Sequence, residues 1–452
     1  MKNDSTRGLF FRFYFVVILL FSAPVLADET QDCAQPLREI ISQRDFGLAY
    51  YCSGLRLEAN SDDAEAQLVF ARAAQELGQW DIAADFARRA RQNPLANSER
   101  FASYLISGMA EAGQGNYLMA KIMLRRGVDY ADNPDEKRII SQAMAQVRAR
   151  APWQFGLSFN VNPSSNVNAG SLHSIHFING LPFNLDADAQ AQKGVGYSLS
   201  TNASYRRQIS ARMLWETTFR LNGTAYEGRG RNDITLGVKT SLQYVPQNPS
   251  AVQWLGYFGF DRRYISKELG GPAFDDYRPY TTQFSVGIER HWQPGPHENW
   301  SGYGSYSLRK PDENGTSDAE IWRLGGSYRF AIFDNATMFI GGYLEDTVSP
   351  DVLISARAGN VSIGLTWHLQ ELPLSLSSNV YYTGVRYKSR ASIDSVVRRD
   401  DVVSLEITGT PRELQWLGFT PTFGVEFTRS FSNLNRFDTR EFRVFTRISS
   451  VF

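Results

Sequence analysis

Apolar and polar residues alternate from about residue 151 to the end of this 452-residue chain, and this alternation constrains the fold more than any other feature. The pattern is clear in 234–244, 283–292, 322–332 and 361–369. A period of two places successive side chains on opposite faces of a β-strand. The region therefore predicts strands with one apolar face and one polar face.

Strand length and aromatic placement indicate what each face meets. The expected strands are about ten to fourteen residues long, whereas strands of soluble sheets average roughly five or six. Tryptophans gather at strand ends, as they do in the girdles of membrane barrels: Trp153, Trp292, Trp300, Trp322 and Trp367. These features favour a transmembrane barrel with lipid outside and a polar lumen. A soluble β-sandwich is the alternative.

The last strand carries a further signal. Residues 442–452 alternate strictly, and the chain ends on Phe452. An amphipathic final strand with a C-terminal Phe resembles the signal that the barrel-assembly machinery reads. We therefore expect that machinery, and outer-membrane lipid, among the partners of this chain.

Fourteen strands are expected in residues 151–452, forming an antiparallel outer-membrane β-barrel. They span 153–161, 195–207, 211–225, 233–245, 252–265, 279–292, 298–310, 319–333, 336–346, 358–369, 372–387, 400–410, 416–430 and 438–452. Long connections follow the odd strands and mostly short ones follow the even strands. Outer-membrane barrels have long outer loops and short periplasmic turns. An even count also leaves both ends of the barrel on the periplasmic side.

The N-terminus predicts export. Lys2, Arg7 and Arg12 precede an apolar run at 13–21, and Ala27 supplies a small residue for cleavage. We interpret 1–27 as a signal peptide. The mature part would then begin at Asp28. It contains two cysteines, Cys33 and Cys52, which we expect to form a disulfide in an oxidising compartment.

Residues 28–150 are Ala-rich and predict helices. A motif of Gly, aromatic and small residues occurs twice, with a fainter copy before it, at spacings of 34 and 37 residues. The defining positions are Phe46 and Ala49, then Gly78, Trp80 and Ala83, then Gly115, Tyr117 and Ala120. The spacing resembles the tetratricopeptide repeat, a helical hairpin of about 34 residues. An unrelated helical bundle is the alternative. In such a hairpin, Cys33 and Cys52 would lie on adjacent antiparallel helices.

Composition argues against several function classes. Lys and Arg total 47 and Asp and Glu total 47, so no basic excess supports nucleic-acid binding. No Ser, His and Asp set marks a nucleophile, so we expect no enzyme. His173 and His176 lack accompanying ligands for a metal, and we expect neither metal nor cofactor. Charges on the polar strand faces are interpreted as a solvated interior: Arg206, Glu216, Arg220, Lys239, Glu289, Arg323 and Glu426.

A helical repeat domain joined to a fourteen-stranded barrel resembles the surface lipoprotein assembly modulator (Slam) family. The resemblance includes the start of the barrel, Pro152-Trp153-Gln154-Phe155-Gly156, and the element at 162–168, where Asn166 and Asn168 stand in a Ser-Asn-x-Asn pattern. The two asparagines are the best functional candidates by this resemblance. Their alternative role is to cap turns in a polar loop.

The resemblance implies translocation across the outer membrane. The client would be a lipoprotein or a small secreted protein, in some relatives one concerned with haem or metal acquisition. The repeats would bind it in the periplasm, where a chaperone is a possible further partner. Passage would use either the lumen or the seam between the first and last strands. A passive porin-like solute channel and a polysaccharide exporter are the rival functions.

Overall fold

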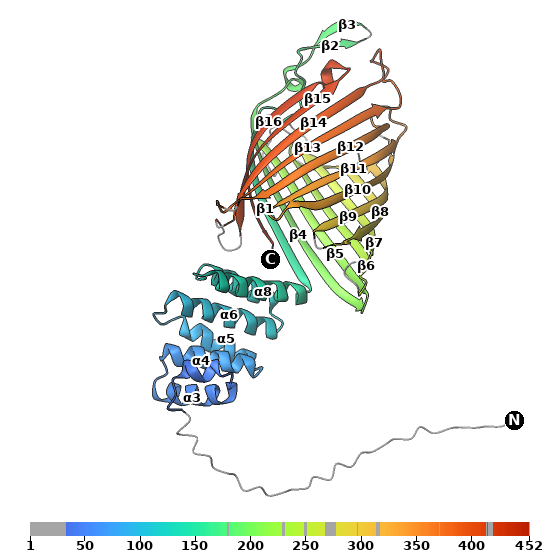
Figure 1. Cartoon of the computed structure of the whole chain (residues 1–452). Helices are drawn as coiled ribbons and strands as arrows, with labels where there is room; N and C mark the ends of the chain where they lie inside the picture. Colours follow the sequence, from blue (N-terminus) through green and yellow to red (C-terminus); the bar gives the residue numbers. More distant parts are fainter. Residues whose placement is uncertain are drawn as a thin grey trace, which may run out of the picture.

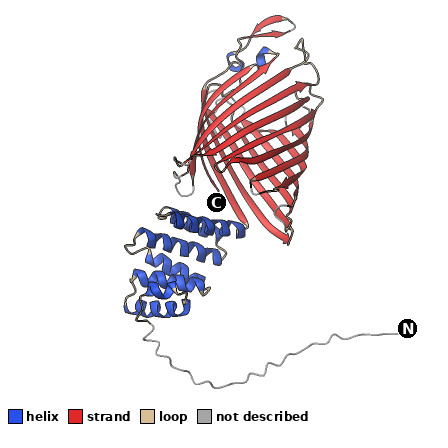
Figure 2. Cartoon of the chain, viewed as in Figure 1, coloured by secondary structure: helices blue, strands red, loops and turns tan. Residues whose placement is uncertain are grey.

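The computed structural model describes residues 33–178, 180–227, 231–247, 251–266, 277–295, 297–312, 317–369, 371–412, 414 and 419–451. The expected signal peptide at 1–27 and the C-terminal Phe452 lie outside these residues. Within them, helices stack as an array beneath one end of a barrel of strands (Figures 1 and 2). The helical array ends at Arg150 and the barrel begins at Trp153.

Seven helices are described in the N-terminal part. They are α2 (Leu37–Ser42), α3 (Phe46–Ala59), α4 (Ala64–Glu76), α5 (Trp80–Ala90), α6 (Asn97–Gly113), α7 (Tyr117–Val128) and α8 (Pro134–Arg150). The first six form three hairpins, and α8 packs on the last of them. Side-chain caps help to begin several helices, because an oxygen at the N-cap satisfies an otherwise unpaired amide. Asp45 accepts from Leu48 N at 3.0 Å, and Asp63 accepts from Ala66 N at 3.0 Å.

The repeated motif corresponds to one structural position in each hairpin. Phe46, Trp80 and Tyr117 are the first residues of α3, α5 and α7. Two residues before them, the backbone is left-handed, with φ of 76° at Gly78 and 84° at Gly115. Arg44 occupies the same position before Phe46 with φ of 62°. The fainter first copy therefore uses the same turn without the glycine.

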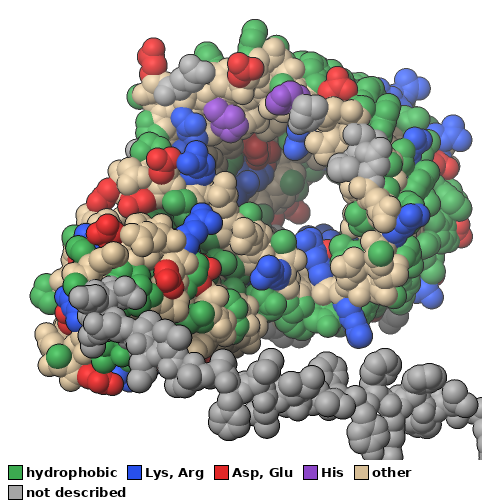
Figure 3. All heavy atoms as spheres, turned by 60° about the horizontal axis from the view of Figure 1, so that its bottom comes forward, with side chains coloured by type: hydrophobic (Ala, Val, Ile, Leu, Met, Phe, Trp, Pro, Cys, Tyr) green, Lys and Arg blue, Asp and Glu red, His purple; other side chains and the backbone are tan. Residues whose placement is uncertain are grey.

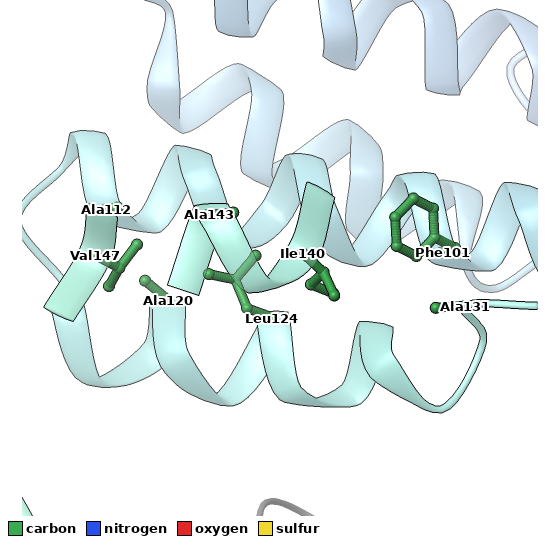
Figure 4. Close-up of a cluster of buried hydrophobic side chains, with 8 residues drawn as sticks. All are labelled: Phe101, Ala112, Ala120, Leu124, Ala131, Ile140, Ala143 and Val147. Atoms are coloured by element: carbon green, nitrogen blue, oxygen red, sulfur yellow. The ribbon is translucent and has the colours of Figure 1, made fainter. Parts of the chain in front are cut away.

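Small residues allow the helices to approach closely. Ala49, Ala83 and Ala120 are fully buried. Trp80 packs over Gly113 of the next hairpin, where an added Cβ would lie 2.4 Å from the indole ring. The largest apolar cluster joins α6, α7 and α8 (Figure 4) and contains Phe101, Ala112, Ala120, Leu124, Ala131, Ile140, Ala143 and Val147.

Cys33 and Cys52 form a disulfide across the first hairpin, with Cα atoms 5.3 Å apart. The bridge closes a loop with a sequence separation of 19 residues. In the chain-entropy model a loop of this length stabilises the fold by about 3 kcal/mol. The terminal hairpin has a neighbour on one side only, so this cross-link compensates for its smaller contact area.

The barrel closes from strands on both sides of the seam. Its strands are β1 (Trp153–Ser164), β4 (Gly194–Ser210), β5 (Met213–Glu227), β6 (Asp233–Tyr244), β7 (Gln253–Ser266), β8 (Tyr277–Trp292), β9 (Glu298–Pro311), β10 (Ala319–Phe333), β11 (Ala336–Val348), β12 (Ala356–His368), β13 (Leu374–Tyr387), β14 (Arg399–Pro411), β15 (Thr420–Ser432) and β16 (Thr439–Val451). Each pairs antiparallel with its neighbours, and β1 pairs with both β4 and β16. The predicted fourteen-stranded barrel is confirmed.

The apolar face of the strands lies on the outside. Val286, Ile288, Leu324 and Leu344 are each more than half exposed, although a soluble sandwich would bury them. Since such side chains need an apolar surrounding, the exterior is a lipid-facing wall. The sandwich alternative is therefore excluded. In the described part of the chain, no helix is both long and apolar enough to span a membrane.

The first long connection contains structure that the sequence did not predict. We expected an irregular loop at 162–194, but β1 continues to Ser164, and β2 (Ile175–Ile178) and β3 (Leu181–Asn184) form a separate hairpin. Their four-residue lengths are too short to show a period of two. Figure 1 shows this hairpin at the end of the barrel opposite to the helices.

The joint between helices and barrel is short and hydrogen-bonded on both sides. Only Ala151 and Pro152 separate α8 from β1. The Ala151 N–H donates to Val147 O in α8 at 2.9 Å, and Pro152 O accepts from Arg206 N in β4 at 2.7 Å. Proline fixes φ within the joint. The last helix and the first strand are therefore held in one orientation.

Candidate functional site

The lumen is lined by oppositely charged side chains on neighbouring strands. Figure 3 shows the barrel hollowed, with basic and acidic groups around the opening. Arg220 contacts Asp261 at 2.9 Å and Lys239 contacts Glu289 at 3.0 Å. The other predicted lumen charges are also in ion pairs, Arg206 with Glu216, Arg323 with Glu345, and Glu426 with Arg443. Pairing of this kind gives a wetted wall without a dominant sign of charge.

The seam between β1 and β16 differs from the other side of β1. The ladder between β1 and β4 is continuous from Trp153–Tyr205 to Ser164–Gly194. The ladder at the seam runs from Gly156–Val451 to Val161–Thr446 and resumes only at Ser164–Arg443. The interruption falls on Asn162 and Pro163, and proline has no N–H to donate to a ladder. The seam is thus the place where the barrel wall has the weaker described pairing beside β1.

Hydrogen bonds from the first outer loop hold the far end of the seam. The Ser164 hydroxyl donates to Glu441 Oε1 at 2.6 Å, and Ser165 N donates to Phe442 O at 3.0 Å. Asn166 is only 3% exposed, and its amide donates to Gly170 O at 2.9 Å and to Arg440 O at 3.1 Å. The predicted Asn166 therefore connects the loop to β16 across the seam.

Asn168 folds the loop upon itself. Its side-chain amide donates to Asp188 O and Gln190 O at 2.8 and 2.7 Å, and its oxygen accepts from Gln192 N at 2.9 Å. These bonds bring the beginning and the end of the loop together. The structure thus places both asparagines in positions that organise the loop and the outer end of the seam.

Ion pairs anchor the β2–β3 hairpin above this end. Arg436 makes two bonds of 2.6 Å to the carboxylate of Asp394, which is 2% exposed, and a third bond to His176 Nε2 at 2.6 Å. Because a guanidinium can only donate, His176 Nε2 accepts and the ring is neutral. Burial first, and then Arg436, lower the pKa of His176, while Asp394 opposes them. The two histidines therefore act in separate ion-pair clusters, since His173 contacts Asp438 at 2.7 Å.

Helix α7 holds the other end of the seam. The Lys121 ammonium donates to Trp153 O on β1 at 3.2 Å, and Arg125 donates to Ser450 Oγ on β16 at 3.1 Å. One helix of the repeat domain thus bonds to both seam strands. By the register, Ser450 faces outward opposite Leu157, so α7 lies against the exterior of the barrel.

The two cations of α7 are buried, at 2% exposure for Lys121 and 6% for Arg125. Burial, followed by the charge of Arg148, lowers the pKa of Arg125 to about 10. Burial also lowers the pKa of Lys121, and the charges of Arg148 and Arg125 lower it further. The contact between α7 and the seam is therefore strongly electropositive. Sequence reasoning missed this site, because the motif at Tyr117 and Ala120 predicted packing inside the helical array only.

The described residues contain no cluster of three or more His, Cys, Asp or Glu side chains able to hold a metal ion. What the arrangement offers is mechanical. A hollow barrel has one seam fixed by a loop at one end and by a helix of the repeat domain at the other. Opening or closing this seam would require only that hydrogen bonds break and form again.

Comparisons with known proteins give the family of the chain. None of the curated protein sequences matches it. Three solved structures resemble the barrel. The toluene transporter TodX of P. putida has a TM-score of 0.37 and 8% identity over 67% of this chain and 90% of TodX. A FadL homologue of Pseudomonas aeruginosa has values of 0.38 and 9% over 67% and 90%. CdiB from Escherichia coli has values of 0.39 and 12% over 66% and 63%.

The family model described as surface lipoprotein assembly modifier matches residues 153–452. The match begins at the first residue of β1 and covers the whole barrel, which is well over half of the chain. The closed barrel with its apolar exterior is that of an outer-membrane protein, as the resemblance in the sequence implied. With this match, the chain belongs to the surface lipoprotein assembly modifier family.

Proposed function

We propose that this protein delivers a client protein, in the first instance a lipoprotein, across the outer membrane to the cell surface. Family membership supports outer-membrane translocation as the general function. In the proposal the repeat domain lies in the periplasm and binds the client. The hairpin at β2–β3 then lies outside the cell.

We further propose that the client passes along the seam between β1 and β16. One observation carries this choice of route. Helix α7 belongs to the repeat domain and donates hydrogen bonds to both seam strands, through Lys121 to Trp153 and through Arg125 to Ser450. A client that displaces α7 would release both strands at once. The interrupted ladder at Asn162 and Pro163 lowers the number of bonds that must then break.

The energy for passage would come from the client rather than from a nucleotide. The sequence contains no phosphate-binding loop, and the structure offers only reversible hydrogen bonds and ion pairs at the seam. Folding of the client outside, binding of the client, or transfer from a chaperone are the sources compatible with this arrangement.

A lock across the seam tests the route. Phe159 on β1 pairs with Ile448 across the seam and with Leu199 on β4 on its other side. All three side chains face outward and have similar exposure. Joining Phe159→Cys to Ile448→Cys by a short thiol-reactive linker closes the seam. Joining Phe159→Cys to Leu199→Cys is the matched control, because it adds the same linker one strand away.

The readout is the set of proteins removed from intact cells by protease, compared between cells with and without this gene. We expect at least one lipoprotein to disappear from the surface of the deletion strain and remain inside the cell. The seam lock should reproduce this loss and the control lock should not. If both locked proteins still export the client, the lumen is the route. If the exterior proteins are unchanged on deletion, a solute channel replaces the translocator, and the hollow lumen in Figure 3 becomes the relevant path.

A further inference from the structure

A groove lies where the start of α7 meets the start of β1. Leu118, Met119 and Ile122 line it from the helix, and Trp153 and Phe155 line it from the barrel. Its volume is about 760 Å³, within the range of pockets that bind small ligands, roughly 300 to 1,000 Å³. Leu118 is 53% exposed, so the groove has an open apolar side.

The apolar wall of the groove continues into the lipid-facing wall of the barrel. Trp153 and Phe155 lie on the same face of β1 as Leu157 and Phe159, because side chains two residues apart share a face. All four are exposed. A molecule in the membrane leaflet on the helical side can therefore enter the groove without crossing a polar surface.

A cation lies in the lining of the groove. Lys121 contributes to the lining and is itself 2% exposed. An ammonium group has three N–H donors, and the bond to Trp153 O uses one of them. Arg125 and Arg148 lie close enough to lower its pKa, so the surrounding potential is positive. The one acid in the lining, Glu111, accepts a bond from Asn116 at 3.0 Å.

We propose that this groove binds an acyl chain of a phospholipid from the leaflet on the helical side, with the lipid phosphate directed to Lys121. The apolar lining and its continuity with the lipid-facing wall select an acyl chain. The cation selects a phosphate-bearing lipid over the acyl anchor of a lipoprotein, which carries no phosphate. The bound lipid would fix α7 to the membrane beside the seam.

Photo-crosslinking tests the proposal on the full-length protein in lipid nanodiscs. The probe is a phosphatidylethanolamine with a diazirine in one acyl chain, present as a minor component with unlabelled phosphatidylethanolamine and phosphatidylglycerol. Labelled residues are identified by mass spectrometry after digestion. We expect labelling of α7 at 118–122 in addition to labelling of the lipid-facing strands, for which Leu199 of β4 serves as an internal standard.

Two variants and one control refine the test. Leu118→Asp places a charge in the groove at the first turn of α7, where an acid suits the helix dipole. It should reduce α7 labelling at least fivefold relative to Leu199. Leu55→Asp on α3 alters a side chain of comparable exposure away from the barrel and should leave α7 labelling unchanged. Lys121→Gln keeps a donor for Trp153 O and should reduce labelling by the phospholipid several-fold.

The head group decides between the two sources of acyl chain. A diacylglycerol with the same diazirine chain should label α7 less than the phospholipid does, and Lys121→Gln should leave its labelling unchanged. Absence of α7 labelling in the unmodified protein, with Leu199 labelled, would overturn the proposal. Equal labelling by both probes, or displacement of the phospholipid by a diacylated lipopeptide, would overturn the assignment to phospholipid. None of these outcomes depends on client export.

Discussion

The turn before each second helix of a hairpin uses one backbone conformation that glycine adopts without strain. Gly78 and Gly115 have open space where a Cβ would lie, so only the backbone conformation disfavours a side chain there. Arg44 adopts the same left-handed conformation with a φ of 62°. An L-residue with a side chain pays roughly 1–2 kcal/mol for such a conformation. The first hairpin therefore carries strain that the other two avoid.

Replacing Arg44 by glycine should relieve this strain. We expect Arg44→Gly to raise the stability of the first hairpin by about 0.5–1 kcal/mol, since the entropy cost of glycine offsets part of the gain. Gly78→Ala and Gly115→Ala should lower stability by about 1 kcal/mol each. Hydrogen exchange of α3, α5 and α7 in the full-length protein measures all three. A loss of stability in Arg44→Gly would show that contacts of the arginine side chain outweigh the backbone strain.

At the scale of elements, the β2–β3 hairpin depends on groups that titrate. Its anchor joins His176 to Arg436, and His173 to Asp438, which also contacts Arg429. The folded pKa of His176 lies below the model value of 6.5, because burial and Arg436 disfavour the charged ring. The stability that neutral His176 contributes is therefore fully present above about pH 6.5 and is lost as the pH falls through the lower folded pKa.

Acid should therefore loosen the hairpin. We expect hydrogen exchange of residues 172–185, corrected for the intrinsic rate, to accelerate between pH 7.5 and pH 5. His176→Gln keeps an acceptor for Arg436 without titrating and should remove this dependence. The contact of His173 with Asp438 gains attraction when His173 is protonated, so His173→Gln should enhance the loosening. A wild-type profile that is flat over this range would contradict the account.

Asp438 acts in the same direction at lower pH. Burial opposes its ionisation, but hydrogen bonds from Arg429 and His173 outweigh burial and lower its pKa below the model value of 3.8. The contribution of its carboxylate is present above about pH 3.8 and is lost as the pH falls through the lower folded pKa. Between pH 7.5 and 5 Asp438 stays ionised, so the change over that range belongs to His176.

The elements also show how far sequence reasoning reaches. The barrel strands could be predicted because each has one lipid-facing and one lumen-facing side, and this environment enforces a period of two. The hairpins of the repeat domain could be predicted because Trp80 and Tyr117 follow a glycine at a fixed distance. The β2–β3 hairpin has too few residues for a period and could not. The contact of Lys121 and Arg125 with the seam brings together residues more than 300 positions apart in the case of Ser450, and no local pattern encodes it.

The whole molecule has two distinguishable ends. The helical array lies at one end of the barrel, and the β2–β3 hairpin lies at the other (Figure 1). Outer-membrane barrels place their long loops outside the cell. The proposed orientation therefore puts Gly180, in the turn of the hairpin, outside, and the turn at 92–96 between α5 and α6 in the periplasm.

Epitope tags inserted at these two turns test the orientation. In intact cells an antibody should bind the tag after Gly180 and not the tag at 92–96. After the outer membrane is permeabilised, both tags should be bound equally. Binding of the 92–96 tag in intact cells would place the repeat domain on the cell surface and would exclude a periplasmic client-binding role.

The two-residue joint at Ala151 and Pro152 gives the molecule a mechanical property. Since α8 continues into β1 through a joint that is hydrogen-bonded on both sides, the helical array behaves as a rigid lever with the first strand as its axle. A client that tilts the array exerts a torque on β1. Because β4 is paired to β1 along its full length and β16 is not, the twist is relieved at the β16 edge. Binding far from the barrel is thereby converted into displacement at a single edge of the wall.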